Sequence, residues 1–205
     1  TCGWIALRLI VVRLRHGGRL LGSERFVLEV VPVALPAQRL IHTSWFHADC
    51  IAAHYGDAPW SPEHWRRLEQ FVHSAVDHGI NLLLTPLFTP PLDTQVGGER
   101  PTVQLVQVDK DGDCYSFDFS RLDRWVAMAD RCGVRFFEMS HLFTQWGAAH
   151  CPKIVATVNG RERKIFGWKD RAAGKKYRNF LDQFLPQLVC HLKKHGIAKR
   201  CYFHV

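Results

Sequence analysis

The clearest pattern along the chain is a repeat of a helix end, a glycine and an apolar strand. The stretches VDHGINLLLTPLF, ADRCGVRFFEMSHLF and LKKHGIAKRCYFHV each pass from a polar helical end through Gly and then Ile or Val into an apolar run. A glycine at this point can adopt the left-handed conformation that ends a helix, and the apolar residue after it can pack against the last turn. The pattern predicts three helix–strand units, whose glycines are Gly79, Gly133 and Gly196.

The helices themselves can be placed from their start signals and apolar spacing. Ser-Pro-Glu at 61–63 offers an N-cap, a proline at the first helical position and an early acid. Apolar residues at helical spacing run between 175 and 195, where Pro186 is expected to kink the helix. With RLIHTSWFH at 39–47 as a first strand, strands and helices alternate to a fourth strand at CYFHV, which predicts an α/β fold with a parallel sheet.

The lengths of the connections indicate where a site would lie. Helix-to-strand turns take one or two residues, whereas the strand-to-helix connections take about 13, 30 and 30 residues. Long loops gathered at the carboxyl ends of parallel strands are typical of the active face of a (β/α) barrel or an open α/β sheet. Within the second long loop, TVQLVQVDKDGDCYSFDF predicts a small hairpin.

Residues 4–36 predict strands of a different kind. The apolar stretches WIALRLIVVRLR and ERFVLEVVPVALP flank HGGRLLGS, whose Gly-Gly pair is a turn signal. We expect these to be the last strands of a β domain, which divides the chain into residues 1–38 and residues 39–205. The chain starts on an apolar stretch without Met and ends inside a predicted strand, so we expect it to be a fragment of a longer protein.

Composition and charge exclude some classes of protein. No apolar run approaches 18 residues, so no membrane span is expected. The net charge is +8, and 12 of the 27 Lys and Arg residues fall within 161–200. Aromatic residues do not alternate with these charges in a nucleic-acid-binding motif, so a solvated basic face is favoured over a nucleic-acid site. The seven cysteines are odd in number, scattered and without a CxxC pair, which favours free thiols and a cytoplasmic location.

Candidate binding residues follow the predicted strands. They are His42, Trp45 and His47 after the first strand, Asp93 after the second, and Glu138, His141 and Trp146 after the third. Glu138 follows two aromatic residues on a strand expected to be buried, so it needs either a charged partner, for which His141 is one candidate, or a polar pocket. Carboxylates, histidines and tryptophans on one face suit a sugar, because carboxylates accept from hydroxyls and indoles stack on the apolar face of the ring.

Two other chemistries fit the sequence less well than sugar binding. His47, Asp49 and His54 could suggest a metal-dependent hydrolase, but their spacing matches no strong zinc pattern, and no metal is expected. GGER at 97–100 lacks the spacing of a nucleotide-binding loop, so no cofactor is expected.

Several long segments resemble glycoside hydrolase family 123, which shares its catalytic region with a widespread bacterial domain of unknown function. The resemblance covers roughly residues 20–205. The segments that carry it are QRLIHTSWFHADCIAAHY, HGINLLLTPLFTPPLDTQVGGERPTVQLV, FDFSRLDRW, FFEMSHLFTQWGAAHCPKI and YFHV.

The resemblance implies both a fold and an activity. The fold is a β-sandwich followed by a (β/α)8 TIM-type barrel, of which this chain would supply the last sandwich strands and barrel strands 1–4. The activity is that of a retaining exo-β-N-acetylgalactosaminidase, in which the 2-acetamido oxygen of the substrate attacks the anomeric carbon, an exception to the two-carboxylate scheme. The partner would be a glycan that contains N-acetylhexosamine.

The family's catalytic residues are not expected within this chain. In the family an Asp orients the acetamide and an adjacent Glu is the general acid and then base, and the pair directly follows the strand that ends in YFH. Here that strand closes the sequence, so no catalytic residue is assigned and the fragment alone is expected to be inactive. A carbohydrate-binding or scaffold protein without catalysis, built on the same architecture, remains the alternative.

Overall fold

The structure, a computed structural model, describes residues 6–33, 36, 39–145 and 147–203. The chain divides into two compact units, residues 1–39 and residues 40–205. The smaller unit is a hairpin, and the larger one contains all of the helices assigned in the described residues.

The smaller unit is an antiparallel hairpin, as the Gly-Gly signal predicts. Strand β1 (Ala6–His16) pairs with β2 (Arg19–Val30), and Gly17 and Gly18 turn the chain at φ 52° and 82°. Apolar side chains of both strands are exposed to solvent, among them Leu9 and Phe26. That the hairpin ends a β-sandwich remains a prediction.

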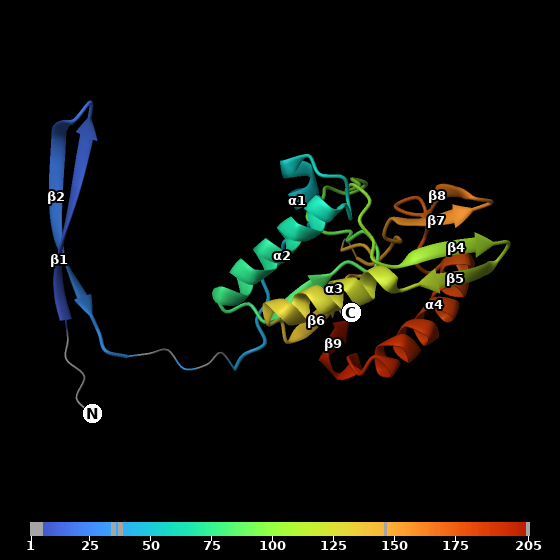
Figure 1. Cartoon of the computed structure of the whole chain (residues 1–205). Coiled ribbons are helices and arrows are strands. Elements are labelled where there is room, and N and C mark those ends of the chain that lie inside the picture. The colour runs from blue at the N-terminus through green and yellow to red at the C-terminus, as the bar shows by residue number, and fades with distance from the viewer. Residues whose placement is uncertain (1–5, 34–35, 37–38, 146, 204–205) are drawn as a thin grey trace. The chain divides into compact units, whose positions relative to one another are not determined.

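The larger unit contains the parallel sheet that the repeat predicts. Its strands lie in the order β3 (Leu82–Thr85), β6 (Phe136–Met139) and β9 (Cys201–Phe203), and both pairings are parallel. Each strand follows a helix: α2 (Pro62–Asp77), α3 (Ser120–Cys132) and α4 (Lys175–Lys194). The chain is thus a mixed α/β protein, and in Figure 1 α2 and α3 lie side by side next to β3 and β6.

The three repeat glycines end these helices in the same way. Gly79, Gly133 and Gly196 have φ of 89°, 91° and 72°, a region that glycine enters without strain. The N–H of the next apolar residue bonds back into the last turn each time, as when Ile80 donates to Ala75 over 3.0 Å. At the other end of α2, the Ser61 hydroxyl accepts from the N–H of His64 over 3.2 Å, so the expected N-cap is confirmed. Helix α4 continues through Pro186.

The predicted first strand, 39–47, is wrong in this structure. No regular strand is assigned there, although the segment lies beside β3. The carbonyl of His42 accepts from the backbone N–H groups of Asn81 and Leu82, each over 3.1 Å. The Asn81 carboxamide accepts from the His42 N–H and donates to the Leu40 carbonyl, each over 2.8 Å. A side chain therefore forms hydrogen bonds that a neighbouring strand would otherwise form, and no strand ladder develops.

The two long loops build a second sheet. The predicted hairpin forms in the loop after β3 as β4 (Gln107–Asp111) and β5 (Cys114–Asp118), and the loop after β6 carries another, β7 (Ile154–Val158) and β8 (Arg161–Phe166). The four strands lie in the order β5-β4-β7-β8, where β4 and β7 are parallel. Aromatic side chains of α4 pack against this sheet, with Phe180 completely buried.

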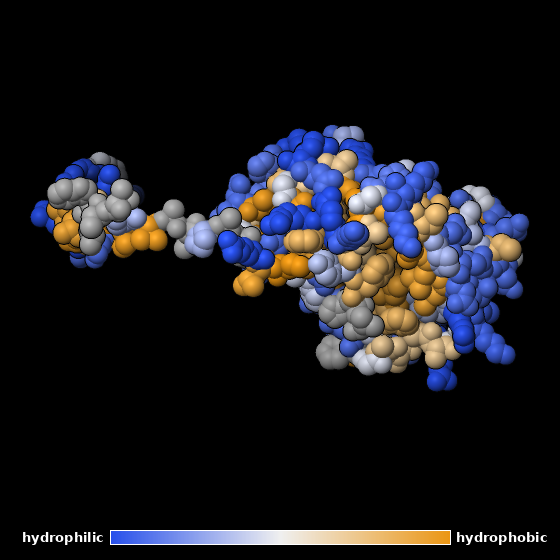
Figure 2. All heavy atoms as spheres, turned by 90° about the horizontal axis from the view of Figure 1, so that it is seen from below, coloured by the Kyte–Doolittle hydropathy of each residue, from blue (hydrophilic) through white to orange (hydrophobic). Residues whose placement is uncertain are grey.

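Apolar surface remains on the larger unit after folding. Tyr202 and Phe203 on β9 are exposed by 43% and 40%. Figure 2 shows orange and tan atoms gathered near the middle of the face seen from below, between blue margins. Among the described helices, none combines the length and the apolar character needed to cross a membrane.

Candidate functional site

A buried carboxylate and a half-exposed tryptophan form the centre of the candidate site. Glu138 on β6 is only 7% exposed, and its Oε2 accepts a hydrogen bond of 2.8 Å from the indole Nε1–H of Trp45. Trp45 is 37% exposed, so part of its ring can still contact a ligand. This hydrogen bond gives Glu138 a polar partner of the kind that a buried carboxylate needs.

His141 adds a second ring to this pair. Its imidazole meets the indole of Trp45 edge to face, with ring centres 5.6 Å apart and planes at 86°. His141 follows β6 by two residues, and Trp45 precedes helix α1 (Ala48–Tyr55). Two segments 93 residues apart in sequence thus place an acid, an indole and an imidazole together.

A second group of side chains joins the segment of Trp45 to the loop after β3. Nε2 of His47 lies 2.7 Å from Oδ2 of Asp93, and because a carboxylate can only accept, Nε2 carries the proton. The His47 side chain is 7% exposed and that of Asp93 is 62% exposed. The backbone N–H of Asp93 donates to Oε1 of Gln145 over 3.1 Å. Asp93 has φ 54°, a left-handed conformation that Asp tolerates better than most residues.

A buried ion pair anchors the loop that carries Asp93. The Arg100 Nε donates to Oδ2 of Asp49 over 3.0 Å, and the two side chains are 9% and 4% exposed. The same guanidinium donates to the Leu92 carbonyl over 3.2 Å and to the Cys50 sulfur over 2.9 Å. These bonds tie the loop after β3 to helix α1, and they fix the residue that precedes Asp93.

Two of the seven sequence candidates are not placed in these groups. His42 is exposed, and its backbone lies beside the start of β3, at the end of the sheet opposite to Glu138. Trp146 lies outside the described residues. The five candidates that the structure brings together in two groups are Trp45, Glu138 and His141, and His47 and Asp93.

The metal-centred alternative does not fit the observed contacts. His47 pairs with Asp93, Asp49 pairs with Arg100, and the ring of His54 packs against Tyr55 at a centre distance of 4.8 Å. These three side chains therefore bind different partners. Sequence reasoning missed Arg100 and Asn81, because their partners lie 51 and 39 or 41 residues away.

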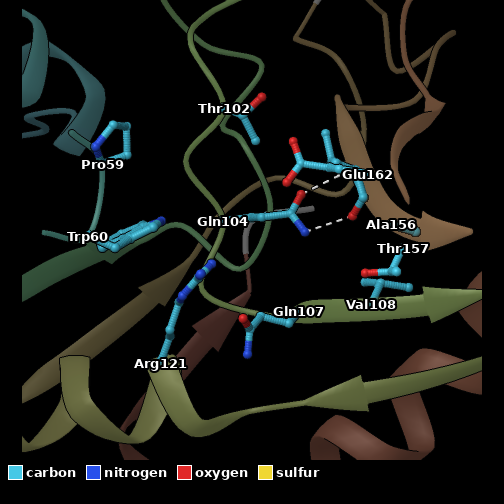
Figure 3. A pocket seen from close by; sticks show the side chains of 11 residues that line it. Pro59, Trp60, Thr102, Gln104, Gln107, Val108, Arg121, Ala156, Thr157 and Glu162 are labelled. Atoms are coloured by element: carbon cyan, nitrogen blue, oxygen red, sulfur yellow. Dashed lines mark hydrogen bonds between the residues drawn. The ribbon is translucent and has the colours of Figure 1, made fainter. Parts of the chain in front are cut away.

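A separate cavity of about 260 Å³ lies beside the second sheet. Trp60, Arg121 and Glu162 are among its lining residues, and none of the six described candidates is. In Figure 3 the Arg121 side chain extends from the start of α3 toward Gln104. The Gln104 carboxamide is already bound, since its Oε1 accepts from the Val155 N–H over 3.0 Å and its Nε2 donates to the Val155 carbonyl over 2.8 Å. No sequence motif pointed to this cavity.

Burial raises the pKa of several groups outside the site. The pKa of the Cys151 thiol rises to about 12 and that of Cys201 to about 11, in both cases chiefly because burial disfavours the thiolate. Burial also raises the pKa of the Tyr177 hydroxyl, which donates to the Leu142 carbonyl over 2.6 Å. These groups stay protonated near neutral pH and are structural.

Comparisons with known proteins show which family this chain resembles. A family model described as glycoside hydrolase 123, catalytic domain, matches residues 45–205. A solved structure of a family 123 glycoside hydrolase from Clostridium perfringens, which concerns the hydrolysis of glycolipid glycans, has a similar fold with a TM-score of 0.65 at 17% sequence identity. That similarity covers 88% of this chain but only 32% of the other. A comparison with curated proteins found no match. Because the family model matches most of its length and includes both groups of candidate residues, this chain belongs to the family of the glycoside hydrolase 123 catalytic domain.

Proposed function

We propose that this chain supplies part of the glycan-binding face of a retaining exo-β-N-acetylgalactosaminidase. The observation that carries the proposal is the contact between Trp45 and Glu138 at the carboxyl end of a parallel strand, in a chain of this hydrolase family. In such sheets, ligands bind at the carboxyl ends of the strands.

Each described residue has a role in this proposal. The exposed part of the Trp45 ring stacks on the apolar face of a sugar, and Glu138 accepts a hydrogen bond from a sugar hydroxyl while the indole N–H keeps it in place. Asp93 projects an exposed carboxylate to a second hydroxyl, and His47 positions it. His141 and Trp146 complete the proposed set of binding residues, and His42 is left out of it because its backbone lies at the other end of the sheet.

The chemistry proposed for the whole protein is substrate-assisted hydrolysis. The 2-acetamido oxygen attacks the anomeric carbon as the glycosidic bond breaks, and water then opens the cyclic intermediate with net retention. The acid/base pair is proposed to lie in a further segment of a longer protein, which agrees with the chain spanning 32% of the solved family member. The parallel order β3-β6-β9, with residues 40–42 beside β3, supports the proposal that residues 39–205 are the first half of a (β/α)8 barrel and residues 1–38 the end of a sandwich.

The test is hydrolysis of aryl β-N-acetylgalactosaminide by the longer protein, beside the same assay on this chain alone. We expect turnover by the longer protein only, the β-anomer as first product, and little turnover of the matching galactoside, which lacks the acetamide. Sugar binding without turnover by the longer protein would instead support a carbohydrate-binding role. Equal rates on both glycosides would refute the substrate-assisted step.

Site variants connect the activity to the described residues. Glu138→Gln removes a charged acceptor, so we expect the specificity constant to fall roughly 10- to 100-fold, or about 1.5–3 kcal/mol. The matched control is Glu69→Gln, because Glu69 pairs with Arg131 at an exposed position on α2, away from these contacts. Equal losses in the two variants would show that Glu138 does not contact the substrate.

A further inference from the structure

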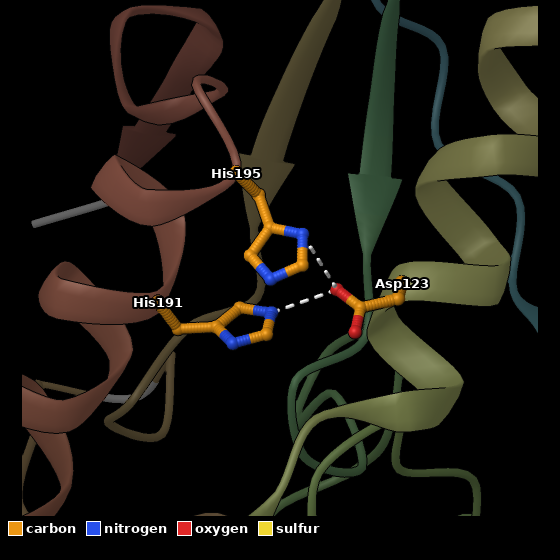
Figure 4. Close-up of side chains that lie close together, drawn as sticks. All are labelled: Asp123, His191 and His195. Carbon is orange, nitrogen blue, oxygen red and sulfur yellow. Dashed lines mark hydrogen bonds and ion pairs between the residues drawn. The ribbon is translucent and has the colours of Figure 1, made fainter.

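Two histidines and a carboxylate converge between α3 and α4. Asp123 lies in the first turn of α3, His191 in the last turn of α4, and His195 is the C-cap of α4. Nε2 of His191 is 2.7 Å from Oδ1 of Asp123, and Nδ1 of His195 is 3.8 Å from the same oxygen. Figure 4 shows both imidazoles turned toward the carboxylate.

The arrangement is ordered by packing before any ligand binds. The His191 ring lies between the ring of Phe119, at a centre distance of 4.5 Å, and the ring of His195, at 4.2 Å, and both neighbours are stacked at 26°. The His191 side chain is 16% exposed, whereas His195 and Asp123 are 41% and 40% exposed. One ligand is therefore fixed, and the other two can adjust while an ion and its waters reach them.

We propose that Asp123, His191 and His195 bind a divalent transition metal, with Zn²⁺ the best fit. Their three ligand atoms, two imidazole nitrogens and a carboxylate oxygen, all lie within 4.8 Å of one another. Ligands about 2.0–2.2 Å from Zn²⁺ in a tetrahedron are separated by roughly 3.3–3.6 Å, so small side-chain shifts suffice. Water completes the coordination. Two nitrogen ligands disfavour Mg²⁺ and Ca²⁺, which prefer oxygen.

This group is the one set of three such ligands found in the described part of the chain. It shares no residue with the glycan-binding groups, so the inference does not depend on the proposed function. A metal here would join the start of α3 to the end of α4. Each side chain is also favourable without an ion, since an acid suits a helix start and histidines a helix end. A metal-free contact of this kind is therefore the competing explanation.

The experiment measures Zn²⁺ affinity by competition with a chromophoric chelator. The protein carries no polyhistidine tag, and its exposed thiols are alkylated, because Cys190 is exposed beside His191 and would bind zinc by itself. We expect one equivalent of Zn²⁺ at an affinity on the order of micromolar or tighter, and a higher melting temperature with Zn²⁺. Mg²⁺ should produce neither effect.

Three variants and one control decide the assignment. Asp123→Asn, His191→Gln and His195→Gln should each weaken Zn²⁺ binding by at least about 10-fold. The control is His73→Gln, because His73 lies 3.6 Å from Asp77 on α2 as an exposed pair without a second imidazole, and it should bind Zn²⁺ like the original chain. His195→Gln changes an exposed C-cap, so it tests the proposal even where His191→Gln unfolds. No saturable binding, or binding that His195→Gln leaves unchanged, would overturn the proposal.

Discussion

Replacing Asp49 by alanine probes the ion pair that holds the loop of the candidate site. The side chains of Asp49 and Arg100 are 4% and 9% exposed, and they are joined over 3.0 Å. Removing one partner of a buried pair leaves an uncompensated charge, which costs about 3–5 kcal/mol. Arg100 keeps its bonds to the Leu92 carbonyl and the Cys50 sulfur, so we expect the lower end, about 3 kcal/mol.

The loss can be read from urea unfolding. With a slope of about 2 kcal/mol per M, a loss of about 3 kcal/mol lowers the urea midpoint by roughly 1.5 M. The double variant Asp49→Ala with Arg100→Met removes both charges, and it should recover most of the loss because no buried charge remains. The control is Glu69→Ala, which breaks an exposed pair and should cost at most about 1 kcal/mol.

Two results would contradict a coupled, buried pair of Asp49 and Arg100. One is a midpoint for Asp49→Ala within the range of the Glu69→Ala control. The other is a double variant that is less stable than Asp49→Ala alone, since the charges would then not be coupled. Because Asp93 follows Leu92, Asp49→Ala in the longer protein should also weaken sugar binding.

The remaining predictions concern buried groups elsewhere. Burial lowers the pKa of His64 below its ordinary value of 6.5, so near that pH the unfolded chain binds a proton that the folded chain does not. The free energy of unfolding should therefore fall as the pH drops below 6.5. In urea unfolding, His64→Gln should make the free energy of unfolding depend less on pH. Asn81→Ala removes the side chain that binds Leu40 and His42 and should lower the free energy of unfolding by about 2–3 kcal/mol. An unchanged melting curve would show that these two hydrogen bonds do not stabilise the segment. Cys151, with its raised pKa, should resist alkylation at pH 8 until the chain unfolds, and labelling of Cys151 in native protein before the exposed thiols would refute the burial. Mass spectrometry should find early labelling at Cys50, Cys114 and Cys190.

Local signals predicted the repeating part of the fold. The N-cap at Ser61 and the glycines after the helices act within one turn of chain, so helix ends and the strands that follow could be placed from sequence. The β7–β8 hairpin is not predicted: Asn159-Gly160 is a strong turn signal, but the segment after it, RERKIF, is mostly charged and lacks the apolar alternation of a strand.

Contacts between residues far apart in sequence are harder to predict from the sequence. Residues 39–47 have the composition of a strand, but the Asn81 side chain forms hydrogen bonds with their backbone. The composition of the segment does not reveal these bonds. The rule that parallel strands bring their carboxyl ends together does predict that Trp45 lies near Glu138 and His47 near Asp93. That these side chains bind a ligand stays a prediction. Arg100, which holds the loop that carries Asp93, lies between glycines and a proline in a segment without periodicity.

A crystal structure of the longer protein with bound N-acetylgalactosamine would show whether the strand-end side chains bind a sugar. The sugar is predicted to stack on Trp45, with a hydroxyl within hydrogen-bond distance of Glu138. A sugar bound instead in the cavity between Trp60 and Arg121, with Trp45 and Glu138 untouched, would contradict it.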